Sequence, residues 1–250
     1  MDTSLEIVNV KRRLRRMQVC LITVMAAAVA TGLLLVNNSG EAVAQDGGKV
    51  RFGEIEVERI NVVAPDGKPR MVLSNKERSP AAVVNGVDLG NGGTRAGMTF
   101  YNAEGDEAGG MGTDNGVHDG KRWASGQLAF DQYKQDQTLV LRYMEQQGAQ
   151  GVGLEVKDRP ETPLSEYFEE YKKISEMPPG PEQDQAMAEF RKKYPSPQRV
   201  FIGKNPDKSS AVTLADGQGT PRIVMRVDQD GNPQIQFMNA KGKVTRTIKG

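Results

Sequence analysis

Hydrophobic and polar residues alternate with a period of two along most of the chain after residue 50. Leu139, Leu141 and Tyr143 fall on one side of such a segment, and the same spacing returns near the C-terminus at 223–227. A period of two places one set of side chains on a buried face and the other in water, which favours antiparallel sheets. The pattern therefore predicts a mainly β fold, with an antiparallel β sandwich or open-barrel-like domain at 50–250.

Turns rich in Asp and Gly separate the expected strands. The sequence D-G-x-P begins at Asp66 and again at Asp230, and a related turn with two inserted residues begins at Asp216. Glycine supplies the positive φ that a tight hairpin needs, so each copy is predicted to close a hairpin. The irregular spacing of the copies argues against a propeller or a solenoid. Two segments rich in Gly, Asn and Asp, 76–97 and 104–126, are expected to be long loops.

A two-helix insert is predicted at 162–195. A proline directly after Thr162 suits the first position of a helix, and apolar residues then recur at helical spacing. A second helix is expected at about 182–194. One amphipathic face of the insert either docks on the chain's own sheet or binds a protein partner; its aromatic residues are Tyr167, Phe168 and Tyr171.

An uncharged apolar segment of twenty residues, Met17–Val36, lies near the N-terminus. As a helix with a rise of about 1.5 Å per residue it is roughly 30 Å long, which matches the hydrocarbon core of a bilayer. We predict a transmembrane helix at 17–36, whose anchoring residues include Met17, Leu21, Leu33 and Val36. Basic residues precede it and none occurs at 37–48, so the positive-inside rule places the N-terminus in the cytoplasm. The residues that set this topology are Lys11, Arg12, Arg13, Arg15 and Arg16.

The expected location is a bacterial inner membrane, which the chain crosses once, with a linker at 37–49 and the β-rich domain on the periplasmic side. A cleaved signal peptide is the alternative, because Ala42-Val43-Ala44 forms an A-x-A site. The apolar segment is longer than the roughly 7–15 residues usual in such signals, which favours the uncleaved anchor. A buried core helix is the third alternative, and the one-sided charge argues against it.

Charge and cysteine content exclude several classes of partner. The totals are 33 basic and 32 acidic residues; without the five basic and two acidic residues of 1–16, the remainder holds 28 and 30. A body of about −2 with mixed signs lacks the basic patch that phosphate backbones require, so nucleic acid is not an expected partner. Cys20 is the only cysteine, which rules out an intramolecular disulfide.

Candidate chemistry is sparse, and we predict no catalytic, cofactor-binding or metal-binding residue. His118 is the only histidine and lies in a Gly/Asp-rich segment, where a solvated side chain is expected. With no second histidine and no cysteine in the body, zinc sites and nucleophile–histidine pairs are nearly excluded. The segment 109–114 matches part of one calcium-binding nonapeptide, and 228–232 offers oxygens; both are better explained as a loop and a turn.

Three segments resemble an uncharacterised family of bacterial proteins with an N-terminal apolar segment. They are ERINVVAPDGKPRMVLSN at 58–75, GMTFYNAEGDEAGG at 97–110 and LAFDQYKQDQ at 128–137. The resemblance covers most of residues 50–160. It implies an anchored or exported β-rich domain, and it implies no activity and no functional residues.

The leading functional hypothesis is a non-enzymatic single-pass protein that serves as a scaffold or accessory subunit of a larger membrane or envelope complex, one version being an energy-transducing complex. It rests on an anchor, a β-rich body, a helical arm and the lack of chemical motifs. A second hypothesis is an envelope binding module for glycan, peptide or calcium, which predicts an open, aromatic-lined groove. A third is a hydrolase that uses two carboxyl groups in a cleft.

Overall fold

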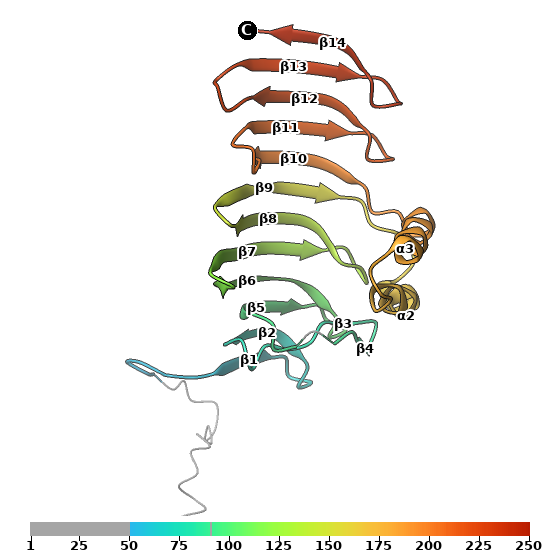
Figure 1. Cartoon of the computed structure of the whole chain (residues 1–250). Coiled ribbons are helices and arrows are strands. Elements are labelled where there is room, and N and C mark those ends of the chain that lie inside the picture. The colour runs from blue at the N-terminus through green and yellow to red at the C-terminus, as the bar shows by residue number, and fades with distance from the viewer. Residues whose placement is uncertain (1–50, 91) are drawn as a thin grey trace, which may run out of the picture. The chain divides into compact units, whose positions relative to one another are not determined.

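The computed structural model describes residues 51–90 and 92–250, which form one large antiparallel sheet and a helix hairpin (Figure 1). The chain divides into two compact units, Met1–Ile55 and Glu56–Gly250, and the architecture below is that of the second. The predicted anchor at 17–36 lies outside the described residues. Among the helices that are described, none has the length and apolar character needed to cross a bilayer.

Twelve strands form the sheet as a simple meander. Neighbours in space are neighbours in sequence, except that β3 and β4 form a separate two-stranded hairpin between β2 and β5. The strands are β1 (Arg59–Val63), β2 (Pro69–Ser74), β3 (Val83–Val84), β4 (Val87–Asp88), β5 (Ala96–Tyr101), β6 (Glu107–His118), β7 (Lys121–Asp131), β8 (Gln137–Gln146), β9 (Ala149–Lys157), β10 (Gln198–Lys204), β11 (Ser210–Ala215), β12 (Pro221–Val227), β13 (Pro233–Met238) and β14 (Val244–Lys249).

The mainly β, antiparallel fold is as predicted, but the described strands form neither two packed sheets nor a closed barrel. Short hairpins join almost every successive pair of strands, so no connection within the described residues leads to a second layer. The longest connection, between β9 and β10, holds the helices and returns to the adjacent strand, as does the connection between β2 and β5 that holds β3 and β4. Both edges stay open, because β1 pairs only with β2 and β14 only with β13.

One turn geometry recurs in five hairpins, which begin at Ala64, Asn102, Asp216, Asp228 and Asn239; this confirms the prediction from the Asp-Gly motifs. In each turn the first residue donates its N–H to the carbonyl of the fifth, and the fourth donates to the carbonyl of the first; Asn102 to Asp106 is one case, with distances of 2.9 and 3.2 Å. The fourth position has positive φ, and it is occupied by Gly67, Gly105, Gly219, Gly231 and Gly242. This is the pattern of a type I turn followed by a left-handed residue.

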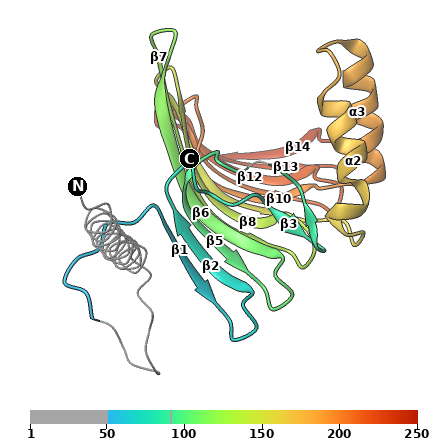
Figure 2. The same cartoon turned by 90° about the horizontal axis from the view of Figure 1, so that it is seen from below.

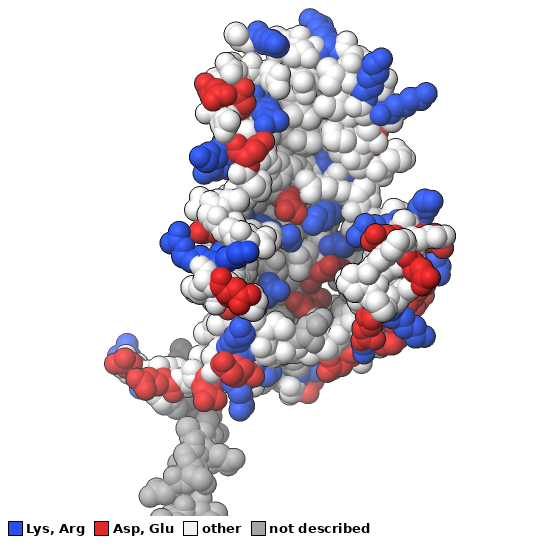
Figure 3. Space-filling view, in the orientation of Figure 1, with Lys and Arg blue, Asp and Glu red and all other residues white. Residues whose placement is uncertain are grey.

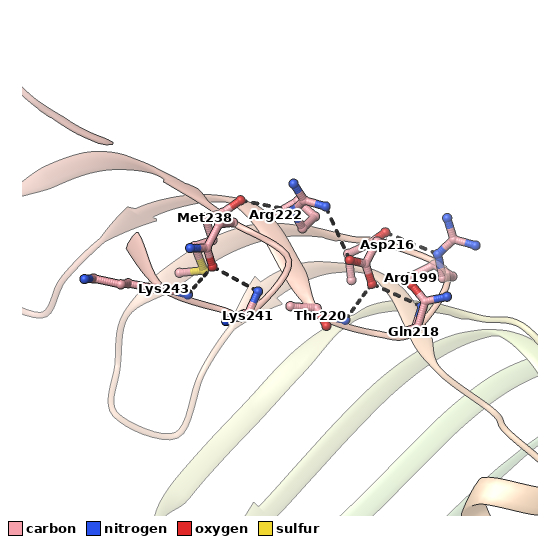
Figure 4. A network of polar contacts seen from close by, with 10 residues as sticks. Arg199, Asp216, Gln218, Thr220, Arg222, Met238, Lys241 and Lys243 are labelled. Atoms are coloured by element: carbon pink, nitrogen blue, oxygen red, sulfur yellow. Dashed lines mark hydrogen bonds and ion pairs between the residues drawn. The ribbon is translucent and has the colours of Figure 1, made fainter. Parts of the chain in front are cut away.

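Side chains reinforce these turns (Figure 4). The Asp216 carboxylate accepts hydrogen bonds from the backbone N–H groups of Gln218 and Thr220, at 3.1 and 3.0 Å. Arg222 then donates from Nε to the carbonyl of Met238 at 3.0 Å, which ties one hairpin to the next. Such bonds satisfy backbone groups that the turn leaves without a partner.

In the turn that begins at Asp216, the Asp-Gly pair does not supply the positive φ that we expected of it. In the turn that begins at Asp216 the residue with positive φ is Gly219, and Gly217 is in an ordinary conformation. We therefore expect Gly219→Ala to destabilise the protein by about 1–2 kcal/mol, because a Cβ is strained at positive φ. The matched variant Gly217→Ala, with no atom within 4 Å of the added Cβ, should change stability by less than about 0.5 kcal/mol. Urea unfolding of both variants measures this; equal losses would contradict the turn assignment.

The segment 104–126, expected to be a loop, mostly forms the long strands β6 and β7. Glycines led to that wrong prediction, yet they are suited to this sheet. A Cβ added to Gly110 would lie 2.6 Å from the carbonyl oxygen of Met98 on the neighbouring strand. The strands approach too closely there for a side chain, so glycine is required by the curvature of the sheet.

The two faces of the sheet differ in chemistry and in what covers them. Figure 2 shows both helices on the concave side of the curved sheet, which we call the helix face. One ladder of paired residues on this face includes the buried Val72, Ala129 and Val140, together with polar and glycine positions. The other side, which we call the open face, has no described element packed against it.

The helix hairpin lies at 164–193, within the predicted insert. It consists of α2 (Leu164–Ser175) and α3 (Pro181–Lys193). Pro181 occupies the first turn of α3, where its missing N–H has no cost. The two helices pack through an aromatic cluster in which Tyr167 stacks on Tyr194 at 4.2 Å and meets Phe190 edge-on at 5.8 Å.

Candidate functional site

A cleft of about 1130 Å³ lies between the helix face and the helix hairpin. Its floor is formed by β2, β5, β6 and β7, one wall by α2 and α3, and the other by the segment that carries β3 and β4. Figure 3 shows acidic atoms gathered in this hollow beside the hairpin. The volume suits a small molecule or a short chain segment.

Two carboxyl groups line the cleft at adjacent strand ends. Glu107 begins β6 and Asp131 ends β7, and these strands pair with each other. One carboxylate oxygen of Asp131 is buried and has no hydrogen-bond partner among the described residues. Neither carboxyl forms an ion pair there; Arg95 and Arg159 act on them only as nearby charges.

The environment raises the pKa of both groups into the neutral range. Burial, and then the charge of Asp136, raise the pKa of Glu107 to about 7. Burial, and then the charges of Glu107 and Asp136, raise the pKa of Asp131 to about 7. Desolvation and like charge both disfavour the ionised form, so the pair stores unfavourable energy when it is ionised. A strongly perturbed pair in a cleft is a candidate functional site.

One of the two cations that act on this pair, Arg159, is already engaged by another carboxylate. Arg159 pairs with Asp136 at 3.2 Å and also donates from Nε to the carbonyl of Gln137 at 2.8 Å. Its guanidinium is therefore held by Asp136 and Gln137, and it forms no ion pair with Glu107 or Asp131. Arg95 also lines the cleft and acts on Glu107 as a nearby charge, so neither carboxyl has a direct cationic partner among the described residues.

A buried glutamine fixes the helical wall of the cleft. Gln135 is only 1% exposed, and its side chain accepts a hydrogen bond from the Tyr167 hydroxyl at 2.8 Å and donates to the carbonyl of Thr162. The backbone of Leu164 also donates to the carbonyl of Lys134 at 2.9 Å. The start of α2 is therefore attached to the β7–β8 turn, four residues from Asp131.

The three aromatic residues predicted as a partner-binding face have different places in the structure. Tyr167 is 6% exposed and is part of the hairpin core. Phe168 and Tyr171 line the cleft, and Tyr171 is 41% exposed. The hairpin is attached to the β7–β8 turn through Gln135 and Leu164. Of the three predicted rings, Phe168 and Tyr171 remain accessible to something in the cleft.

Other candidates from the sequence do not meet at one place. The side chain of His118 is 86% exposed at the end of β6, as expected for a solvated residue. The segment 109–114 is part of strand β6, so it is not the loop that we expected, whereas 228–232 is the predicted turn. Within residues 51–90 and 92–250, no group of three His, Cys, Asp or Glu side chains is placed to hold a metal ion.

Sequence reasoning missed Glu107, Asp131 and Gln135. The chain has 32 acidic residues, and nothing in their spacing marks these two. Their proximity follows from strand register and from the bulge between Glu107 and Gly109. A scan against models of protein families found none that matches this chain, and a search of curated proteins found no match. The resemblance noted for 58–137 therefore stays a prediction.

Proposed function

We propose that the protein is a non-enzymatic binding module, held at a bacterial inner membrane by residues 17–36, whose cleft takes a peptide segment that carries a basic side chain. The observation that carries this proposal is the buried pair Glu107 and Asp131, which forms no ion pair among the described residues and leaves one oxygen of Asp131 without a hydrogen-bond partner. A primary amine or guanidinium would supply the missing charge and donate to the free oxygen of Asp131. Its aliphatic stem would lie along Phe168 and Tyr171.

A peptide fits the cleft better than the other two ligand classes. Sugar rings bind on flat, exposed aromatic faces. Here the Tyr167 and Tyr194 rings stack on each other, and the two accessible rings, Phe168 and Tyr171, are tilted by 36° and form no single flat platform. Aromatic residues of the strands do not add a platform to the cleft. Phe100 and Tyr143 alternate onto the open face, and Trp123, although it alternates onto the helix face, is not among the residues that line the cleft. Calcium prefers six to eight oxygen ligands, and the described residues contain no cluster of three or more acidic side chains placed to hold a metal ion.

Peptide binding is tested with the full chain and a labelled pentapeptide that has a central lysine. We expect saturable binding, a loss of at least about tenfold in affinity for Asp131→Asn, and no binding of the same peptide with an acetylated lysine. Asp119→Asn is the matched control, because that carboxylate is 82% exposed and far along β6–β7 from the cleft. Equal affinity for both variants, or preference for a cell-wall glycan or for Ca²⁺, would overturn the assignment.

A carboxylate-based hydrolase is the second candidate. The specific observation in its favour is the pKa of about 7 for both Glu107 and Asp131, which suits a general acid or base at neutral pH. Incubation of the full chain with envelope peptides and glycans would then release new reducing or amino ends. Glu107→Gln would abolish that release, and absence of any product from the parent protein rejects this candidate.

A further inference from the structure

The open face carries an uninterrupted apolar row across the whole sheet. Strand pairing places one residue from each of the twelve strands in this row, and every one of them is apolar. The row consists of Ile60, Leu73, Met98, Met111, Leu128, Leu141, Leu154, Ile202, Val212, Met225, Ile235 and Ile248.

A second row lies beside it, two residues along each strand. It contains ten apolar residues, Gly109 and a terminal Arg246; the apolar residues are Val62, Met71, Phe100, Phe130, Leu139, Val156, Val200, Leu214, Ile223 and Phe237. We call the two rows together the apolar stripe. None of its apolar side chains is buried by the described residues, and central ones such as Leu141 and Ile202 are each 48% exposed.

We propose that the apolar stripe is the interface through which a second copy of this chain packs, face to face, in a homo-oligomer. Strands about 4.8 Å apart and two rows per face make the stripe about 50 Å long and about 15 Å wide, on the order of 800 Å². That area equals what one partner contributes to a stable protein interface, and it exceeds the roughly 300–600 Å² of the largest apolar patch on a typical monomer.

The chemistry of the stripe suits a copy of itself. A symmetric interface requires that one patch be complementary to itself, and a surface without charge meets that condition at every position. The single charge, Arg246, lies on the edge strand β14, so a two-fold axis through the middle of the stripe leaves both copies of it at the rim. Rows of branched, aromatic and methionine side chains also interdigitate between two packed sheets about 10 Å apart.

This inference is independent of the cleft, which lies on the helix face. The sequence led us to expect a role in assembly, and the apolar stripe is a defined surface for that role. Copies of the β-rich domain associate through the open face and leave each cleft accessible. It also explains how a sheet with one apolar face is kept from aggregating, because the exposed stripe is covered in the oligomer.

The test is co-purification of two full-length copies that carry different tags and are produced together. When one tag is used for capture, we expect the copy that carries the other tag to be recovered with it. Leu141→Glu should reduce that recovery at least about tenfold, because the interface would bury a charge without a partner. Met144→Glu is the matched control: it lies on the same strand, alternates onto the helix face and is 51% exposed. This control should retain full recovery.

Each other outcome overturns the proposal. Parent copies that fail to co-purify show that the stripe does not bind a second copy. Recovery that Leu141→Glu leaves unchanged places the contact elsewhere, for example at residues 17–36. Transfer of the stripe to lipid vesicles, with co-purification lost once vesicles are added, would identify a membrane surface as its occupant. Circular dichroism of the Leu141→Glu protein checks that it folds, which its 48% exposure in one copy allows.

Discussion

A Gln135→Leu variant is expected to lose about 3 kcal/mol of stability, equivalent to roughly 8 °C in melting temperature. Leucine fills a similar volume but offers no polar atom. The Tyr167 hydroxyl and the Thr162 carbonyl, which both bond to Gln135, would then be buried without a partner. Each such group costs about 1–3 kcal/mol, and Gln135 itself is 1% exposed, so water cannot replace it.

A double-mutant cycle separates the polar contact from packing. Tyr167→Phe removes the hydroxyl, so the double variant Gln135→Leu with Tyr167→Phe should recover about 1 kcal/mol relative to the sum of the single changes. Gln185→Leu, on the exposed surface of α3, is the control and should change stability by less than about 0.5 kcal/mol. Additive single effects would show that Gln135 does not fix α2 to the β7–β8 turn.

The hairpin turns could be predicted because their chemistry is local. Positive φ at the fourth turn position selects glycine, and an Asp or Asn at the first position bonds to backbone N–H groups two and four residues later, as Asp228 does. The α2–α3 hairpin was likewise visible from proline positions and helical spacing. Boundaries differ from the prediction by one or two residues, since helix ends depend on packing.

The number of layers could not be predicted from alternation. A period of two shows that each strand has one apolar face, but it does not show what covers that face. We expected a second sheet, whereas the described residues cover only the polar helix face, and the apolar stripe stays open. Strands β6 and β7 were missed for a related reason, because glycines required by close strand approach resemble those of loops.

Stability is expected to fall as the pH rises from about 5 to 8, because of Glu107 and Asp131. The pKa of each is about 7 in the folded protein, against ordinary values of 4.5 and 3.8. Between those limits the folded state binds more protons than the unfolded state, so raising the pH favours unfolding. The stability that protonation of these two carboxyl groups contributes is fully present below about pH 4 and is lost as the pH rises through 7.

The Asp131→Asn variant isolates this effect, because an amide keeps the shape of the protonated acid and does not ionise. One unit of pKa corresponds to about 1.4 kcal/mol. With partial solvent screening, the free energy of unfolding of the variant should exceed that of the parent by about 2 kcal/mol at pH 8. At pH 4 the two should be equal. Urea unfolding of the full chain measures the difference, with the exposed Asp119→Asn as the control. A constant difference between pH 4 and 8 would mean that Asp131 is already neutralised by a cation, which would also remove the basis for basic-peptide binding in the cleft.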